Sequence, residues 1–275
     1  MGKETEQKQE IVNQGVHTYS QEEAYVWPEE PVLREQLEWF QDQKLALMVH
    51  WGVYNQLGMV ASWALSDEDA EWSRKTVDWT DDGEVFKRQY RALNRAFDPV
   101  AFQPEEWAKM AKECGFRYLI LTTKHHDGFC LWDTAYTEYK TTAEDCPFHT
   151  HKYADIVCAM FDAFRKEKLG IGVYYSKADW HCPDYWEKEK VFTGKTTRNP
   201  TYDPKENPEA WERFRAFTRD QILELGKQYG RLDILWFDAG WVCKANGQDI
   251  DLGGIVDEAL RRSHLRNQSL RSLPE

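Results

Sequence analysis

The chain alternates short apolar runs with longer segments in which apolar residues recur at helical spacing. Continuous apolar runs occupy residues 45–52, 118–123, 171–176 and 232–241. Runs of this length, bounded by glycine or polar residues, are typical of parallel strands that are buried on both faces. Helical spacing occurs at 32–41, 102–114, 155–166, 209–229 and 249–262. The regular succession of strand, loop and helix predicts an α/β fold of the (β/α)8 TIM-barrel type.

Polar side chains gather at the end of each predicted strand. The clusters contain His50, the pair His125 and His126, Tyr175, and Asp238. The carboxyl ends of parallel barrel strands meet at one face, where barrel enzymes place their chemistry. A single Asp after a strand more often caps the next loop, and a single buried His is more often a satisfied core residue. Recurrence at the same end of several strands favours a shared functional site instead.

A long acidic segment follows the first predicted strand. It runs from Asn55 to Tyr90 and exceeds a plain connection in a compact domain, which predicts a functional loop or lid. Trp63 is the residue in it that is best suited to face a ligand. The acidic run within the segment is expected to be a solvated loop, and it consists of Asp67, Glu68, Asp69 and Glu71.

Composition narrows the classes of partner. A length of 275 residues suits one large domain, and the net charge of −12 argues against nucleic acid or an anionic membrane surface. Thirteen tryptophans offer flat faces for stacking on sugar rings. The six cysteines contain no CxxC pair and are expected to be reduced thiols. The polar N-terminus lacks an apolar signal region, so we expect a cytoplasmic protein as written, or a periplasmic or secreted one if a signal was removed.

The histidines leave a metal-dependent barrel hydrolase open. Three histidines and an acid at one end of a barrel could bind zinc. Two features argue against this alternative: the chain has no HExxH spacing, and adjacent His125 and His126 point to opposite faces if the strand continues through them.

The polar clusters and their flanking residues resemble, in order and spacing, α-L-fucosidases of glycoside hydrolase family 29 over about residues 28–260. The matching blocks are His50-Trp51-Gly52, Lys124-His125-His126-Asp127-Gly128-Phe129 with Leu131-Trp132-Asp133, Val173-Tyr174-Tyr175-Ser176 with Asp179-Trp180-His181, and Ile234-Leu235-Trp236-Phe237-Asp238.

The resemblance implies a retaining exo-glycosidase that removes terminal α-L-fucose from a fucosylated carbohydrate, without a cofactor or metal. In the family's pattern the residue matching Asp238 is the nucleophile, and Trp63 matches the aromatic wall of the pocket. The residues matching the family's fucose-holding positions are His50, His125, His126, Tyr175 and Trp236. Retaining hydrolysis also needs a second carboxyl about 5–5.5 Å from the first as acid and base. That residue cannot be named from this sequence.

The sequence departs from the family in two ways. Many members carry Glu-Trp where this chain has Ser62-Trp63, so a carboxylate often placed at the pocket is missing. A closed barrel needs about eight strands, whereas four apolar runs are visible. We therefore expect the N-terminal half to two-thirds of a barrel at 28–262, preceded by a polar segment at 1–27 and followed by an atypical tail at 263–275.

The apolar pattern stops beyond Ala259, and we hypothesise that the tail is frameshifted or chimeric. An inactive truncated remnant that at most binds sugar is therefore a further alternative. An open half-barrel would leave strand edges and apolar surface exposed, which predicts association between copies of the chain.

Overall fold

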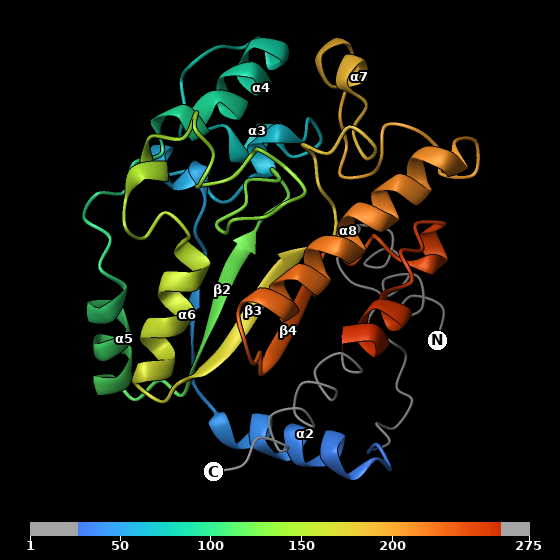
Figure 1. Ribbon diagram of the computed structural model, residues 1–275. Helices are drawn as coiled ribbons and strands as arrows, with labels where there is room; N and C mark the ends of the chain where they lie inside the picture. The colour runs from blue at the N-terminus through green and yellow to red at the C-terminus, as the bar shows by residue number, and fades with distance from the viewer. Residues whose placement is uncertain (1–26, 260–275) are drawn as a thin grey trace, which may run out of the picture. The chain divides into compact units, whose positions relative to one another are not determined.

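The computed structural model describes residues 27–259 and contains one parallel sheet of four strands in the order β1-β2-β3-β4 (Figure 1). The strands are β1 (Ala46–Val49), β2 (Tyr118–Lys124), β3 (Gly170–Ser176) and β4 (Ile234–Asp238). All three pairings are parallel, so the carboxyl ends of the strands lie at the same edge. The four predicted strands are confirmed, and the arrangement is consistent with part of a (β/α)8 barrel. The expected burial on both faces holds for β2 and β3 only, because β1 and β4 are half-buried or exposed along their length.

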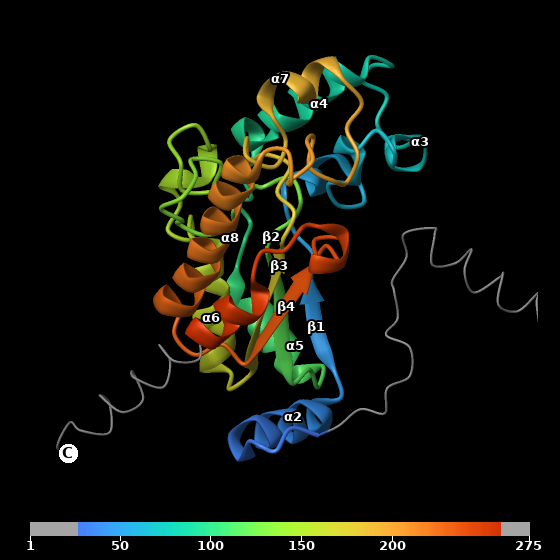
Figure 2. The same cartoon turned by 90° about the vertical axis from the view of Figure 1, so that its right-hand side faces the viewer.

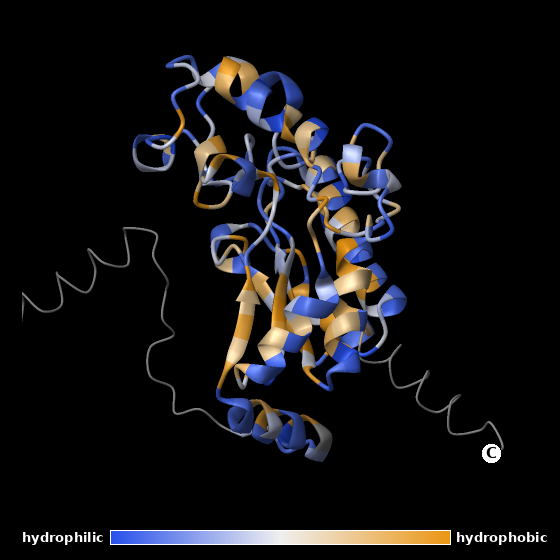
Figure 3. Ribbon diagram, turned by 90° about the vertical axis from the view of Figure 1, so that its left-hand side faces the viewer, coloured by the Kyte–Doolittle hydropathy of each residue, from blue (hydrophilic) through white to orange (hydrophobic). Residues whose placement is uncertain are grey.

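Three helices cover one face of this sheet (Figures 1 and 2). They are α5 (Pro104–Glu113), α6 (Ile156–Lys166) and α8 (Pro208–Gln228). The helix starts follow from the sequence, because Pro104 occupies the first turn of α5 and the Asp155 side chain accepts a hydrogen bond from Cys158 N (2.8 Å) at the start of α6. The helices and strands share one large apolar core. In Figure 3 the strands are coloured mainly as hydrophobic ribbon.

The opposite face of the sheet carries its own small cluster. Tyr118, Ile120 and Tyr174 are buried there, with Ala46 and Ile234 packed against them. The strand register explains the grouping, since Ala46 pairs with Tyr118 and Gly172 pairs with both Ile120 and Ile234. Alternate side chains of neighbouring strands therefore share this face.

The long segment after β1 is more ordered than an open loop. It contains η1 (Val53–Leu57), η2 (Trp63–Leu65), α3 (Ala70–Ser73) and α4 (Gly83–Arg91). The expectation of a solvated acidic loop is wrong for two of its residues. Asp67 contacts Lys87 Nζ (2.5 Å), and Asp69, which is 2% exposed, pairs with Arg198 (2.6 Å). The Asp67–Lys87 pair stabilises the segment internally, and the Asp69–Arg198 pair connects it to a later part of the chain.

The remaining described elements are short helices of the second compact unit and one helix of the first. The short helices are η3 (Ala92–Ala96), η4 (Pro147–Thr150), α7 (Lys188–Thr193), η5 (Lys244–Asn246) and a helical stretch at 252–259. The chain divides into two compact units, residues 1–44 and 45–275, and the first contains the predicted helix as α2 (Pro31–Gln43). The predicted tail at 263–275 and residues 1–26 lie outside the described residues. Within residues 27–259, no helix combines the length and apolarity that crossing a membrane requires.

Candidate active site

The Asp238 carboxylate lies at the carboxyl end of β4 and is held by two donors. Its Oδ1 accepts a hydrogen bond from Ala239 N (2.7 Å), and its Oδ2 accepts one from the Tyr174 hydroxyl. Ala239 has a φ of 69°, so the backbone turns sharply just after the strand. The side chain of Asp238 is 36% exposed and can be reached by a ligand.

The surroundings of Asp238 favour its charged form. Burial raises the pKa of the carboxyl, whereas the hydrogen bonds donated by the Tyr174 hydroxyl and the Ala239 amide lower it. The net pKa is lowered from the ordinary value of an Asp, so the group is ionised at neutral pH. An ionised, fixed and accessible carboxylate is suited to nucleophilic attack.

His125 and His126 lie together beside Asp238, because the strand does not continue through them, which was the condition for their pointing to opposite faces. β2 ends at Lys124, so strand alternation does not extend through the two histidines. Their ring centroids are 4.4 Å apart. His126 Nε2 lies 3.7 Å from Asp238 Oδ2, and one potential ligand atom from each of the three residues lies within 4.8 Å of the others.

Burial keeps the histidines of this site neutral. It lowers the pKa of His126 to about 4, against the opposing influence of the Asp238 carboxylate. It also lowers the pKa of His125 well below the usual range, and neighbouring His126 and His50 add to that shift. The pKa of His50 is lowered by burial too. Neutral imidazoles supply one donor and one acceptor each, which suits the hydroxyl groups of a sugar.

Small hydroxyl groups orient two of these rings. His50 Nδ1 lies 2.9 Å from Thr122 Oγ1, and His125 Nδ1 is hydrogen-bonded to Ser62 Oγ. The His50 ring packs edge-on against His125, with ring centroids 4.8 Å apart. His50 therefore belongs to the same cluster as His125 and His126.

Trp63 forms an aromatic wall over this cluster. Its ring centroid lies 5.1 Å from that of His126, 5.9 Å from that of Trp180 and 6.1 Å from that of Trp241. On top of Trp63 lies the Arg198 guanidinium, 4.9 Å from the ring centroid. Trp63 therefore lies beside the histidine cluster, and its role as the wall of a sugar pocket stays a prediction.

The structure places Tyr175 away from this cluster and Tyr174 within it. Tyr175 is fully buried, and its hydroxyl lies 2.8 Å from Gln221 Oε1 on α8 and 2.9 Å from Lys124 Nζ. Tyr174 instead reaches Asp238. The strand register explains this placement, because Tyr174 pairs with Trp236 and Ser176 pairs with Asp238, so that Tyr174 lies on the same face of the sheet as Asp238. The expected contact of Tyr175 with a ligand is therefore not supported by its position.

Trp236 shares the face of Asp238, as strand alternation predicts, and is 48% exposed.

The contacts of Ser62 and Thr122 with histidines could not be predicted from the sequence, because the partners lie 63 and 72 residues away. Such pairings become visible only when the strand ends are brought together in space.

Comparison with known proteins identifies the family. The family model described as Alpha-L-fucosidase matches residues 12–270 of the chain. The chain belongs to the α-L-fucosidase family. These matches do not favour the metal-dependent hydrolase that the histidines also allow.

Solved structures of α-L-fucosidases are similar to this chain in part. The α-L-fucosidase isoenzyme 1 from Paenibacillus thiaminolyticus is 31% identical with a TM-score of 0.60, over 82% of this chain and 47% of its own. The unliganded α-L-fucosidase AlfC from Lactobacillus casei is 30% identical with a TM-score of 0.60, over 82% of this chain and 68% of its own.

Curated relatives show the same partial coverage. The human tissue α-L-fucosidase is 26% identical over 205 residues, which is 74% of this chain and 40% of the relative. The chain thus spans about 40% of the length of such relatives.

Proposed function

We propose that this chain carries the nucleophile half of a retaining α-L-fucosidase site and acts on terminal α-L-fucose of a fucosylated carbohydrate. The observation that carries the proposal is Asp238, an accessible carboxylate that is held by Tyr174 and Ala239 beside neutral histidines. The four strands would then form part of a (β/α)8 barrel.

The proposed chemistry is a double displacement. In the first displacement, the Asp238 carboxylate would attack the anomeric carbon, a C–O bond to the enzyme would form, and the bond to the leaving-group oxygen, which takes up a proton, would break. In the second displacement, water would attack the same carbon, the bond to Asp238 would break, and free fucose would leave. The hydroxyl groups of the sugar would lie against His50, His125 and His126, and Trp63 and Trp236 would supply apolar surface. Support comes from a family relative, since the Bacteroides thetaiotaomicron enzyme was solved as a trapped covalent intermediate in complex with 2-fluoro-fucosyl fluoride.

Covalent labelling with 2-fluoro-fucosyl fluoride tests the nucleophile without requiring a known acid/base residue. Fluoride leaves without protonation, so a positioned carboxylate suffices to displace it. We expect intact-mass spectrometry to show one added fluorofucosyl group on the wild-type chain and peptide mapping to place it on Asp238. The Asp238→Asn variant should remain unlabelled.

Asp162→Asn is the matched control, because Asp162 is an exposed carboxyl on α6. It should label at the wild-type rate. A folded wild-type chain that gains no label, or a label that persists in Asp238→Asn, would contradict the proposal.

A further inference from the structure

Three side chains at the carboxyl ends of β2 and β4 have the composition of a transition-metal site. His125 and His126 are buried and Asp238 is half-buried, and one ligand atom from each lies within 4.8 Å of the others. Two imidazole nitrogens and a carboxylate oxygen suit zinc or copper, whereas magnesium and calcium prefer oxygen-only sites.

His126 offers a free ligand atom directed at the carboxylate. Its Nδ1 lies 3.4 Å from the Ala178 carbonyl oxygen, which can only accept a hydrogen bond, so the neutral ring carries its proton on Nδ1. The Nε2 lone pair is buried without a hydrogen-bond partner and lies 3.7 Å from Asp238 Oδ2. Two acceptors thus face each other, and a cation between them would satisfy both.

The other two ligands are oriented by their own partners. His125 Nδ1 is bonded to Ser62 Oγ, which leaves its Nε2 available, and Asp238 is held by Tyr174 and by Ala239 N (2.7 Å). Outer partners of this kind fix the ligands of natural zinc sites. Tetrahedral zinc with bonds of about 2.0–2.1 Å needs ligand atoms roughly 3.3 Å apart, which small side-chain rotations can reach from the present spacing.

We propose that His125, His126 and Asp238 bind one Zn²⁺ or Cu²⁺ ion, and that this ion blocks the sugar site rather than serving as a cofactor. Metal binding itself does not depend on the proposed function. The inhibition of the sugar site does rest on the proposed function, because a metal on Asp238 would occupy the lone pair that attacks the anomeric carbon.

Calorimetric titration with ZnCl2 alone tests the binding. We expect one saturable site on the wild-type chain, weakened at least about tenfold in His126→Gln. His149→Gln, which changes an exposed histidine on η4, should bind Zn²⁺ as the wild type does, and MgCl2 should give no site. If His126→Gln fails to fold, Asp238→Asn provides the same test, because asparagine has nearly the shape of aspartate but lacks the negative charge that binds the metal.

Equal Zn²⁺ affinity in the wild type, His126→Gln and Asp238→Asn would overturn the proposal. In a second arm, Zn²⁺ should slow labelling by 2-fluoro-fucosyl fluoride, and a chelator should restore the rate. Labelling that proceeds unchanged at saturating Zn²⁺ would refute the block. A chain that binds Zn²⁺ but never labels would count against the fucosidase function and not against the metal site.

Discussion

At the scale of single residues, the site depends on which hydroxyl group reaches Asp238. The Tyr174 hydroxyl donates to Asp238 Oδ2 and also lies 3.2 Å from Ser176 Oγ. Burial and the nearby Asp238 carboxylate raise the pKa of Tyr174, so it remains a donor throughout the physiological pH range. Tyr174 therefore keeps its proton and stabilises the ionised Asp238 carboxylate by donating a hydrogen bond to it.

Replacing Tyr174 by Phe should slow the labelling of Asp238 by roughly 10–100-fold, because a hydrogen bond to a charged group contributes about 1.5–3 kcal/mol. Loss of the donor should also raise the pKa of Asp238. The acid limb of the labelling rate would then move to higher pH, which a rate profile with 2-fluoro-fucosyl fluoride measures.

Tyr175→Phe removes the same atom from the neighbouring residue and is the matched control. It should leave the labelling rate and its acid limb in place and reduce stability instead, since Lys124 and Gln221 lose a partner. Equal effects of the two variants on labelling would contradict the assignment of Tyr174, rather than Tyr175, to the face of β3 that carries the site.

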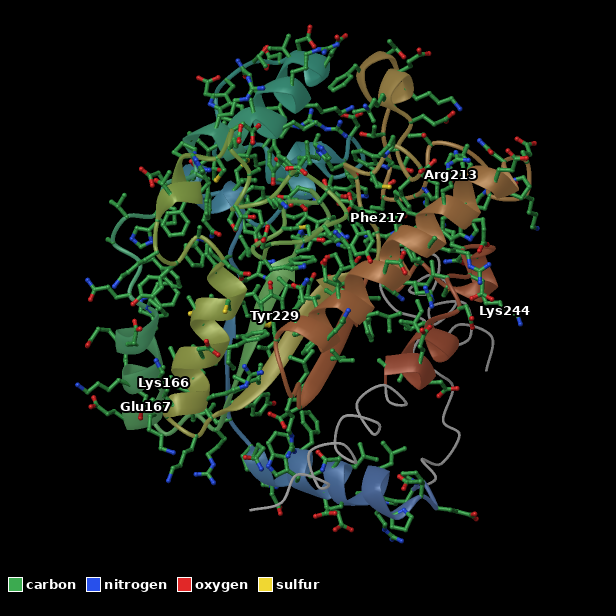
Figure 4. All side chains as sticks on the ribbon, viewed as in Figure 1. Lys166, Glu167, Arg213, Phe217, Tyr229 and Lys244 are labelled. Atoms are coloured by element: carbon green, nitrogen blue, oxygen red, sulfur yellow. The ribbon has the colours of Figure 1, made fainter. Side chains whose placement is uncertain are left out.

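At the scale of elements, β2, β3 and α8 are joined by a buried ionic network. Lys124 Nζ is fully buried and lies 2.8 Å from Asp179, 2.9 Å from the Tyr175 hydroxyl and 3.1 Å from Gln221 on α8. It also lies 5.3 Å from the ring centroid of Phe217, which is labelled on α8 in Figure 4. Asp179 in turn accepts hydrogen bonds from two backbone amides of the loop after β3.

Lys124→Met should lower the free energy of unfolding by about 3–5 kcal/mol, because it leaves the Asp179 charge buried without its cation. Lys190→Met is the control, since the Lys190–Glu187 pair is exposed, with side chains 54% and 35% exposed, and should cost about 1 kcal/mol or less. Urea denaturation measures both. A Lys124→Met variant as stable as Lys190→Met would show that the network does not anchor α8.

The elements differ in how far the sequence could predict them. The strands and α5, α6 and α8 were predicted to within a few residues, because their apolar runs and capping residues are local signals. α4 was missed, since only Phe86 and Tyr90 of its apolar side chains are buried and the stretch around it is strongly polar.

Contacts between residues far apart in the sequence could not be predicted either. Asp67 is bonded to Thr196 N, 129 residues away, and Asp69 is bonded to Arg198 across the same separation. Within the site, the sequence indicated the histidines and Asp238 by their place at strand ends, and Trp63 by its place in the long segment after the first strand. It did not indicate that Tyr174, rather than Tyr175, contacts Asp238, or that the strand ends before His125 and His126. A strand end cannot be located to one residue from an apolar run.

At the scale of the whole molecule, buried titratable groups make stability depend on pH in opposing ways. Burial raises the pKa of Asp127 to about 7, so this carboxyl favours the folded state at low pH and loses that contribution as the pH rises from about 4 to 7. Burial lowers the pKa of His181, which is stacked on Tyr139 with ring centroids 4.1 Å apart, to about 4. The unfolded chain then binds a proton below pH 6.5 that the folded chain does not, so His181 removes stability as the pH falls towards 4.

His181 belongs to the same group as His50, His125 and His126, whose pKa values are also lowered by burial. These histidines outnumber Asp127, so we expect the free energy of unfolding to fall between pH 7 and pH 5. His181→Gln should reduce that fall by at most about 2 kcal/mol, which is the linkage expected from a shift between 6.5 and about 4. His149→Gln should not change it, since His149 is exposed. Urea denaturation at the two pH values measures the difference, and a fall of the same size in wild type and His181→Gln would mean that His181 is already protonated in the folded chain at pH 5.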